Sequence, residues 1–103
     1  MKVVYTEQSI TGLEELLSFL IEEQNLSIEK VVIIKNQLMD LADSLALNPM
    51  KGQREEYLQH LHQDHRRLIS DYIKIIYKVE DNTVFITDFF DSRQDPSKMK
   101  GLL

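Results

Sequence analysis

The apolar positions of the chain follow a helical period in its first half and a strand period in its second half. From Glu7 to Gln24 they recur every three or four residues, which predicts an amphipathic helix with Thr6 as its N-cap. The same spacing predicts a second helix, which Ser27 caps and which reaches Leu45. The two apolar stripes consist of Ile10, Leu13, Leu16, Leu17, Leu20 and Ile21, and of Ile28, Val31, Ile34, Leu38, Leu41 and Leu45. Because the connection "QNLS" is short, the two helices should be antiparallel neighbours.

Runs rich in β-branched and aromatic residues predict strands at 2–5, 66–70, 71–79 and 83–90. The last three form an antiparallel meander, with breaks at Ser70-Asp71 and Asp81-Asn82. Asn48-Pro49, followed by Gly52, ends the helical half, and residues 53–65 fit either a short helix or an irregular linker. The length of 103 residues predicts a single domain spanning 1–103. The expected fold class is α+β: an N-terminal strand and an antiparallel helical hairpin packed on a C-terminal antiparallel β-meander.

A two-residue turn at Asp81-Asn82 sets the register of the last hairpin. It pairs Glu80 with Thr83, Val79 with Val84, Tyr77 with Ile86 and Ile75 with Asp88. One face then holds Ile73, Ile75, Tyr77, Val79, Val84 and Ile86, and the other holds Lys74, Ile76, Lys78, Phe85, Thr87 and Phe89. Because the first face is almost wholly apolar, we expect the helices to cover it. The second face combines aromatic and basic side chains and is expected to remain open for a partner.

Composition restricts the partners and the compartment. The net charge of −5 disfavours contact with phosphate backbones and anionic lipid. The sequence contains no cysteine, which indicates a reducing compartment. No stretch has the apolar length of a leader peptide or of a membrane span. We therefore expect a cytoplasmic protein that does not contact a membrane.

The usual motifs of metal sites and catalytic sites are missing from the sequence. The spacing of His60, His62 and His65 suits neither one helix face nor one strand face, so we interpret them as polar loop histidines and expect no metal. The three glycines, at positions 12, 52 and 101, cannot form a phosphate-binding loop, and no serine lies in a nucleophile elbow. No cofactor is expected.

A set of basic and aromatic residues in the second half is more informative. Its members are Arg66, Arg67, Lys74, Lys78 and Arg93, with Phe85 and Phe89 between them. This mixture suits an acidic partner or stacked bases. The alternative is that the lysines keep the strands soluble and guard against edge pairing, while the phenylalanines fill gaps. The sequence leaves both interpretations open.

The order of the elements, the pattern "NPxxGQ" and the segment "HRRLISDYIKIIYKVEDNTVFITDFFDSRQDP" resemble the RelE/ParE superfamily of toxins from prokaryotic toxin–antitoxin modules, and especially its ParE or plasmid-stabilisation branch. The resemblance covers nearly the whole chain. It implies a small toxin that acts on DNA gyrase and is neutralised by a cognate antitoxin, whose unfolded tail wraps across the helices and the sheet. It also implies that Arg93 projects toward the working face and that Pro96 ends the last strand. Asp91 stands where many ParE-type relatives carry histidine, and its carboxylate could pair with Arg93 and mute it.

Under this hypothesis, the residues that contact the target or the antitoxin are Lys74, Lys78, Phe85, Phe89 and Arg93. A second hypothesis is a ribosome-dependent mRNA endoribonuclease of the RelE type. In that case Arg66, Arg67, Lys74 and Arg93 would hold the phosphate and Tyr77 would transfer a proton. The acidic net charge and the lack of a suitable titrating group after position 93 disfavour this hypothesis. A third is an inactive toxin homologue, and a homodimer also remains open.

Overall fold

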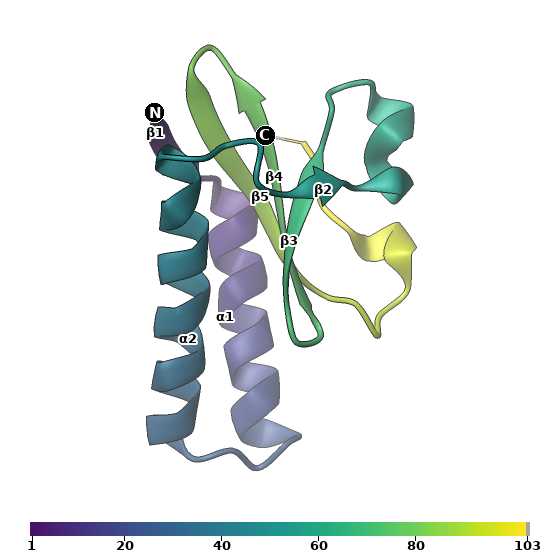
Figure 1. Cartoon of the computed structure of the whole chain (residues 1–103). Coiled ribbons are helices and arrows are strands. Elements are labelled where there is room, and N and C mark those ends of the chain that lie inside the picture. The colour runs from purple at the N-terminus through teal and green to yellow at the C-terminus, as the bar shows by residue number, and fades with distance from the viewer. Residues whose placement is uncertain (103) are drawn as a thin grey trace.

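The computed structural model describes residues 1–102, in which two helices pack on one side of a sheet (Figure 1). The sheet has five strands in the order β1-β5-β4-β3-β2. The helices are α1 (Glu7–Glu22) and α2 (Ile28–Asp43), and the strands are β1 (Lys2–Tyr5), β2 (Gln53–Arg54), β3 (Arg66–Ser70), β4 (Ile73–Glu80) and β5 (Thr83–Asp91). Three short 3₁₀ helices complete the chain: η1 (Ser44–Ala46), η2 (Glu56–Leu61) and η3 (Pro96–Lys98). The predicted α+β class and the order of its elements are confirmed. No helix in residues 1–102 has the length and apolar character needed to cross a membrane.

Both helices begin where their capping residues predict. The side chain of Thr6 accepts a hydrogen bond from the Ser9 amide (3.1 Å), and that of Ser27 accepts one from Lys30 (3.2 Å). The predicted ends are too late by a few residues. α1 stops before Asn25, whose φ of 54° does not fit a right-handed helix, and the end of α2 tightens into η1.

The apolar stripes contribute less to the core than their spacing predicts. Leu13, Leu16, Leu38 and Leu45 are buried against the sheet as expected. In contrast, three predicted members are largely exposed: Ile10 at 47%, Ile21 at 39% and Ile28 at 70%. Ile21 and Ile28 lie beside the loop between the helices, which extends past the sheet (Figure 1). The helical pair therefore leaves apolar side chains exposed at that end.

The β4–β5 hairpin follows the predicted register for only half its length. Asp81 and Asn82 both have positive φ, as a two-residue turn of this kind requires, and Tyr77 pairs with Ile86 as expected. Beyond that pair the register shifts: Ile76 pairs with Asp88, so Thr87 is an extra residue in β5. The predicted pairing of Ile75 with Asp88 is wrong.

The bulge also corrects the predicted position of Phe89. Ile75 pairs with Phe89 because of the extra residue in β5, so Phe89 lies on the helix side of the sheet. There it is 3% exposed in the main core, together with Ile75 and Tyr77. The prediction that Phe89 lies on the second face is therefore wrong.

The second face of the sheet is covered by the chain itself. η2 and the C-terminal segment lie on the side opposite the helices (Figure 1). A second apolar cluster there contains Leu58, Ile76, Phe90 and Met99, with Leu61 packed against it. The expectation of an open second face is wrong over this region, because η2 and residues 96–101 fold back over it.

The turn after α2 is fixed to the sheet by Tyr77. The Tyr77 hydroxyl donates a hydrogen bond to the Pro49 carbonyl (2.8 Å) and accepts one from the Gly52 amide (2.9 Å). A Cβ atom at Gly52 would lie 2.6 Å from this hydroxyl and 2.6 Å from the Arg67 carbonyl oxygen. Only glycine fits this close approach, which explains the "NPxxGQ" pattern in physical terms.

We predict that Tyr77→Phe destabilises the protein by about 1–3 kcal/mol, because it leaves the buried Gly52 amide and the partly buried Pro49 carbonyl without this partner. The free energy of unfolding from urea titrations measures this loss. Tyr72→Phe is the matched control: Tyr72 is 60% exposed, so the same change there should alter stability by less than about 0.5 kcal/mol. Equal stabilities of the two variants would show that the two hydrogen bonds of the Tyr77 hydroxyl do not stabilise the protein.

Candidate functional site

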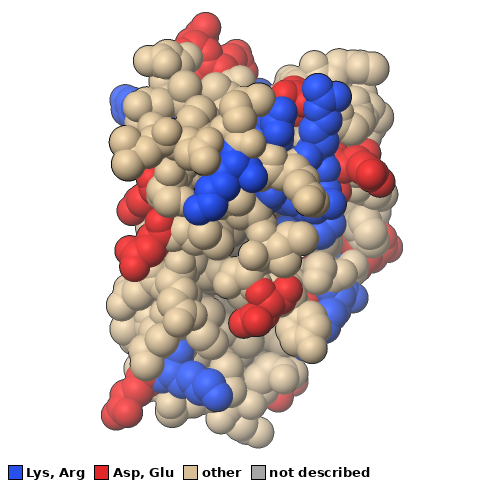
Figure 2. Space-filling view, in the orientation of Figure 1, with Lys and Arg blue, Asp and Glu red and all other residues tan. Residues whose placement is uncertain are grey.

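The basic residues predicted from the sequence do gather on the sheet half of the molecule. We name the group formed by Arg54, Arg66, Arg67, Lys74 and Lys78, which lie on β2, β3 and β4, the basic band. Figure 2 shows Lys and Arg side chains gathered over the region of β2 and β3, with acidic side chains beside them. The band is thus a local positive region on a protein of net charge −5.

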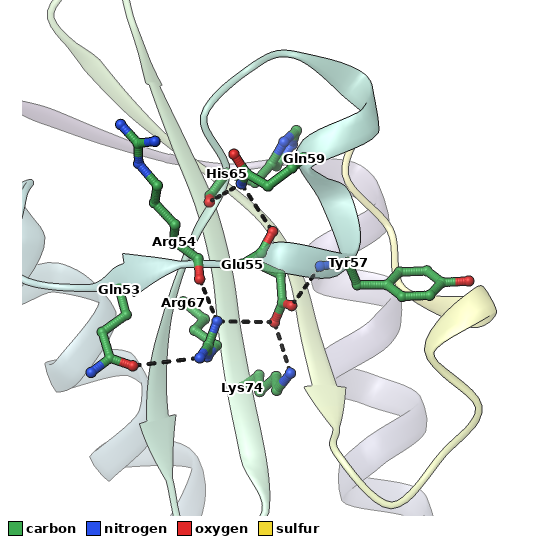
Figure 3. A network of polar contacts seen from close by, with 8 residues as sticks. All are labelled: Gln53, Arg54, Glu55, Tyr57, Gln59, His65, Arg67 and Lys74. Atoms are coloured by element: carbon green, nitrogen blue, oxygen red, sulfur yellow. Dashed lines mark hydrogen bonds and ion pairs between the residues drawn. The ribbon is translucent and has the colours of Figure 1, made fainter.

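Glu55 is the centre of this band, and the sequence analysis missed it. Its side chain is 3% exposed, and its Oε1 lies 2.8 Å from Lys74 Nζ and 3.9 Å from Arg67 Nη1 (Figure 3). Its Oε2 accepts a hydrogen bond from the Tyr57 amide (3.2 Å), and its own amide donates to the His65 carbonyl (2.8 Å). A single buried carboxylate therefore ties η2 to β3 and β4.

The remaining cations of the band also have partners within the chain. Arg66 donates to the Gly52 carbonyl (2.8 Å), and Arg67 donates to the Arg54 carbonyl. Lys78 donates to Gln63 (2.9 Å) and pairs with Glu80 (3.1 Å), while Arg54 pairs with Asp64 (3.1 Å). Each cation of the basic band therefore has a hydrogen-bond acceptor or an acidic partner within the chain, and these contacts stabilise the fold.

Two of the predicted site residues are not available at the surface. Tyr77 is fully buried, its hydroxyl is occupied by the turn after α2, and burial raises its pKa. It is therefore wrongly predicted as a proton-transfer group. Phe89 lies in the core, so only Phe85, half-buried opposite Lys78, remains of the aromatic pair.

Arg93 is bound by the neighbouring carboxylate, as the sequence suggested. Its Nε and Nη2 donate to the two oxygens of Asp91 at 3.0 and 2.7 Å, and its amide donates to Asp91 Oδ1 at 2.9 Å. The guanidinium also lies over the Tyr72 ring, 4.7 Å from its centre. The pairing with Arg93 lowers the pKa of the Asp91 carboxyl. This turn ends β5 at Asp91, so the expectation that Pro96 ends the strand is wrong; Pro96 starts η3 instead.

The three histidines have different environments. His60 and His62 are exposed, as expected of polar residues, and His65, in the loop between η2 and β3, is fully buried. The His65 Nε2 lies 2.6 Å from the Gly101 carbonyl oxygen, and burial lowers the His65 pKa. This contact holds the C-terminal segment against η2. Among residues 1–102 no three histidine, aspartate or glutamate side chains are grouped as metal ligands.

Asp88 is a second buried carboxylate that sequence reasoning missed as a site residue. Its side chain is 3% exposed, and Oδ2 accepts a hydrogen bond from the Lys100 amide (3.0 Å). A Cβ atom at Gly12 would lie 2.6 Å from Oδ1, so the glycine in α1 makes room for this carboxylate. Burial raises the pKa of Asp88. In the sequence, the charged Asp88 stands within the run "FITDFF", and this position was the signal that a carboxylate would be buried.

Comparison with known proteins identifies a family. A family model described as "ParE toxin of type II toxin-antitoxin system, parDE" matches residues 3–96. This range contains both helices and every strand except the first residue of β1. The match confirms the resemblance inferred from the sequence. A search of curated proteins gave no match.

We predict that Glu55→Gln lowers the free energy of unfolding by about 2 kcal/mol, because hydrogen bonds to charged groups contribute about 1.5–3 kcal/mol each. The loss is measured by urea titration. Glu56→Gln removes the same charge at the next position, where the side chain is exposed, and should leave stability unchanged. If both variants lost stability equally, net charge rather than the Glu55 contacts would be the cause.

Asp88→Asn should stabilise the protein near neutral pH. Burial raises the folded-state pKa of Asp88 above its usual value of about 3.9, so the folded state keeps a proton that the unfolded chain has lost. The raised pKa of Asp88 contributes to the free energy of unfolding. This contribution is fully present below the unfolded-state pKa and is lost as pH rises through the folded-state pKa. We therefore expect a higher melting temperature for Asp88→Asn near neutral pH, and a difference that shrinks below about pH 4. Asp40→Asn, at an exposed position, should show no such pH dependence.

Proposed function

Because the chain belongs to the ParE toxin family of type II toxin–antitoxin systems, we propose that it inhibits growth by binding DNA gyrase and that a cognate antitoxin neutralises it. Membership of the family implies the antitoxin as a partner. The match over residues 3–96 is the observation that carries the proposal. The gyrase target follows from the resemblance to the ParE branch.

The geometry of the basic band favours a binding function over ribonuclease activity. An endoribonuclease of the proposed kind needs unpaired cations for the phosphate and an accessible proton-transfer group. Here Arg67 and Lys74 share Glu55, and Tyr77 is enclosed in the core. The acidic net charge also weakens the attraction to RNA.

Arg93 is the side chain that we propose as the main contact with the target. Its side chain is 49% exposed, in contrast to 14% for Arg66 and 19% for Arg67. Asp91 occupies the Nε and Nη2 side of the guanidinium, which leaves the Nη1 side for a carboxylate of the partner. Tyr72 and Asp91 together hold this group in one orientation, which lowers the entropy lost on binding.

Exposed apolar side chains on the helical pair support the antitoxin part of the proposal. Ile28 is 70% exposed, Ile33 57% and Val32 47%, and all three lie on α2. A partner segment that folds on binding would remove these side chains from water. Acidic residues of the same segment would be attracted electrostatically to the basic band on the sheet half.

We predict that the purified protein inhibits the supercoiling activity of DNA gyrase. Arg93→Ala should raise the concentration needed for half inhibition about tenfold or more, as expected when a central arginine is removed from an interface. Lys35→Ala, which removes one exposed cation from α2, is the matched control and should inhibit like the native protein.

Full supercoiling at a saturating concentration of the protein would contradict the gyrase proposal. Codon-linked cuts in translated messages, detected by primer extension after expression, would favour the ribonuclease instead. Harmless expression of both the native protein and Asp91→Asn would favour an inactive homologue, because the change frees Arg93 from its carboxylate.

A further inference from the structure

β1 lies at one end of the sheet, and no strand of residues 1–102 lies beside its outer edge (Figure 1). Its inner edge pairs in parallel with β5, and the Thr6 amide donates to the Ile86 carbonyl (3.1 Å). The backbone of Thr6 therefore points toward β5, and so does that of Val4, because backbone groups alternate in direction along a strand. The N–H and C=O groups of Val3 and Tyr5 consequently point outward, where no backbone group from outside the sheet bonds to them within residues 1–102.

The other end of the sheet offers less open backbone. β2 pairs with β3 only at Arg66 and Arg67, so residues 68–70 lie past its end. A Cβ atom at Gly52 would lie 2.6 Å from the Arg67 carbonyl oxygen, which shows that the Arg67 backbone points toward β2. By the same alternation, Ile69 is the residue of this short stretch whose backbone points outward. An added strand could form about two hydrogen bonds there, in contrast to about four at β1.

Partly exposed apolar side chains lie beside the open edge of β1. Val4 pairs with Phe85, and the side chains of both are only half-buried. The Met1 amine donates to the Ala46 carbonyl (3.1 Å), which places the next residue, Leu47, near the start of β1. Leu47 is 94% exposed. A partner strand at this edge would therefore remove apolar surface from water in addition to forming backbone hydrogen bonds.

We propose that the outer edge of β1 binds a second copy of this chain, with the two β1 strands antiparallel and the two sheets joined. The two-fold axis passes through Val4, which lies opposite Val4 of the second copy. Val3 of each copy lies opposite Tyr5 of the other, and each such pair exchanges the outward hydrogen bonds. The same residues supply both sides of the interface, as a closed two-fold dimer requires. On the face that carries Phe85, the two valines extend the apolar row from one sheet to the other.

The charges at the ends of β1 favour a second copy as the partner. In this register Met1 of one copy lies opposite Glu7 of the other, so the N-terminal ammonium group attracts an exposed carboxylate. A lysine on an edge strand normally discourages pairing. Here Lys2 lies opposite Thr6, and the two lysines of the dimer are roughly 14 Å apart, so no like charges meet.

Sedimentation equilibrium of the purified protein tests the proposal. An interface of this size supports only weak association, so we expect a monomer–dimer equilibrium with a dissociation constant of about 10–100 µM. Val4→Lys places two ammonium groups opposite each other on the axis, and Val4→Glu places two carboxylates there, and like charges in this position repel. Each variant alone should be monomeric at about 500 µM. An equimolar mixture of the two should form dimers again, because a lysine then lies opposite a glutamate.

Two further variants control this experiment. Ile69→Lys places the same ammonium group at the other open edge, where Ile69 is 58% exposed, and should dimerise like the native protein. Val3→Pro removes an outward N–H group without changing the charge, at an edge position where proline is tolerated. It should weaken the dimer about tenfold, because each copy loses one hydrogen bond.

A native protein that stays monomeric at about 1 mM would overturn the proposal. So would a dimer that Val4→Lys leaves intact, or the absence of dimers in the mixture when circular dichroism shows both variants folded. Loss of the dimer in Ile69→Lys would also overturn it and would locate the interface at β3. If Val4→Lys does not fold, Val3→Pro decides, and an unweakened dimer in that variant refutes the proposal. These measurements involve neither gyrase nor an antitoxin, so their outcome is independent of the proposed function.

Discussion

The β4–β5 hairpin carries apolar side chains on both of its faces, and the need to bury them determines the rest of the structure. The helices α1 and α2 cover one face through Leu13, Leu16 and Leu38. No regular element remains for the other face, so η2 and the C-terminal segment fold over it with Leu58 and Met99. Short irregular segments have little backbone hydrogen bonding of their own and need side-chain contacts to stay in place.

The basic band supplies those contacts. Glu55 joins η2 to Lys74 and Arg67, and Lys78 reaches Gln63 in the loop that follows η2. Buried carboxylates and lysines are costly to desolvate, and they are tolerated here because each finds a partner of opposite charge or a hydrogen bond. A positive surface of this kind is easily taken for a nucleic-acid site. Its hydrogen-bond partners indicate instead that much of its charge is used within the fold.

The sequence predicts the features that depend on neighbours in the chain. Thr6 and Ser27 mark the helix starts, and Asp81-Asn82 sets the hairpin register as far as Tyr77. An alternating pattern cannot reveal the extra residue at Thr87, and the predicted face of Phe89, which follows it, was therefore reversed. Asp88 within an apolar run was a hint, because strict alternation would have placed a carboxylate in the core.

The parts that the sequence did not predict involve contacts between distant segments. Residues 53–65 have no clear period, so neither the buried Glu55 nor the contact of His65 with Gly101 could be read from them. The pairing of Arg93 with Asp91 could be anticipated because the two residues are only two positions apart. The burial of Asp88 depends on α1, β5 and the C-terminal segment together, through Gly12 and the Lys100 amide, and no local sequence pattern predicts contacts between such distant segments.

The parallel pairing of β1 with β5 has a consequence for synthesis. β1 is the first strand to be made, and its only neighbour in the sheet begins at Thr83. At about 5–20 residues per second, a ribosome needs roughly 4–16 s to reach that strand after β1. During this interval the nascent chain cannot close its sheet, and the apolar stripes of both helices stay in contact with water or chaperones. The sheet is therefore completed late, only after β5 has been translated.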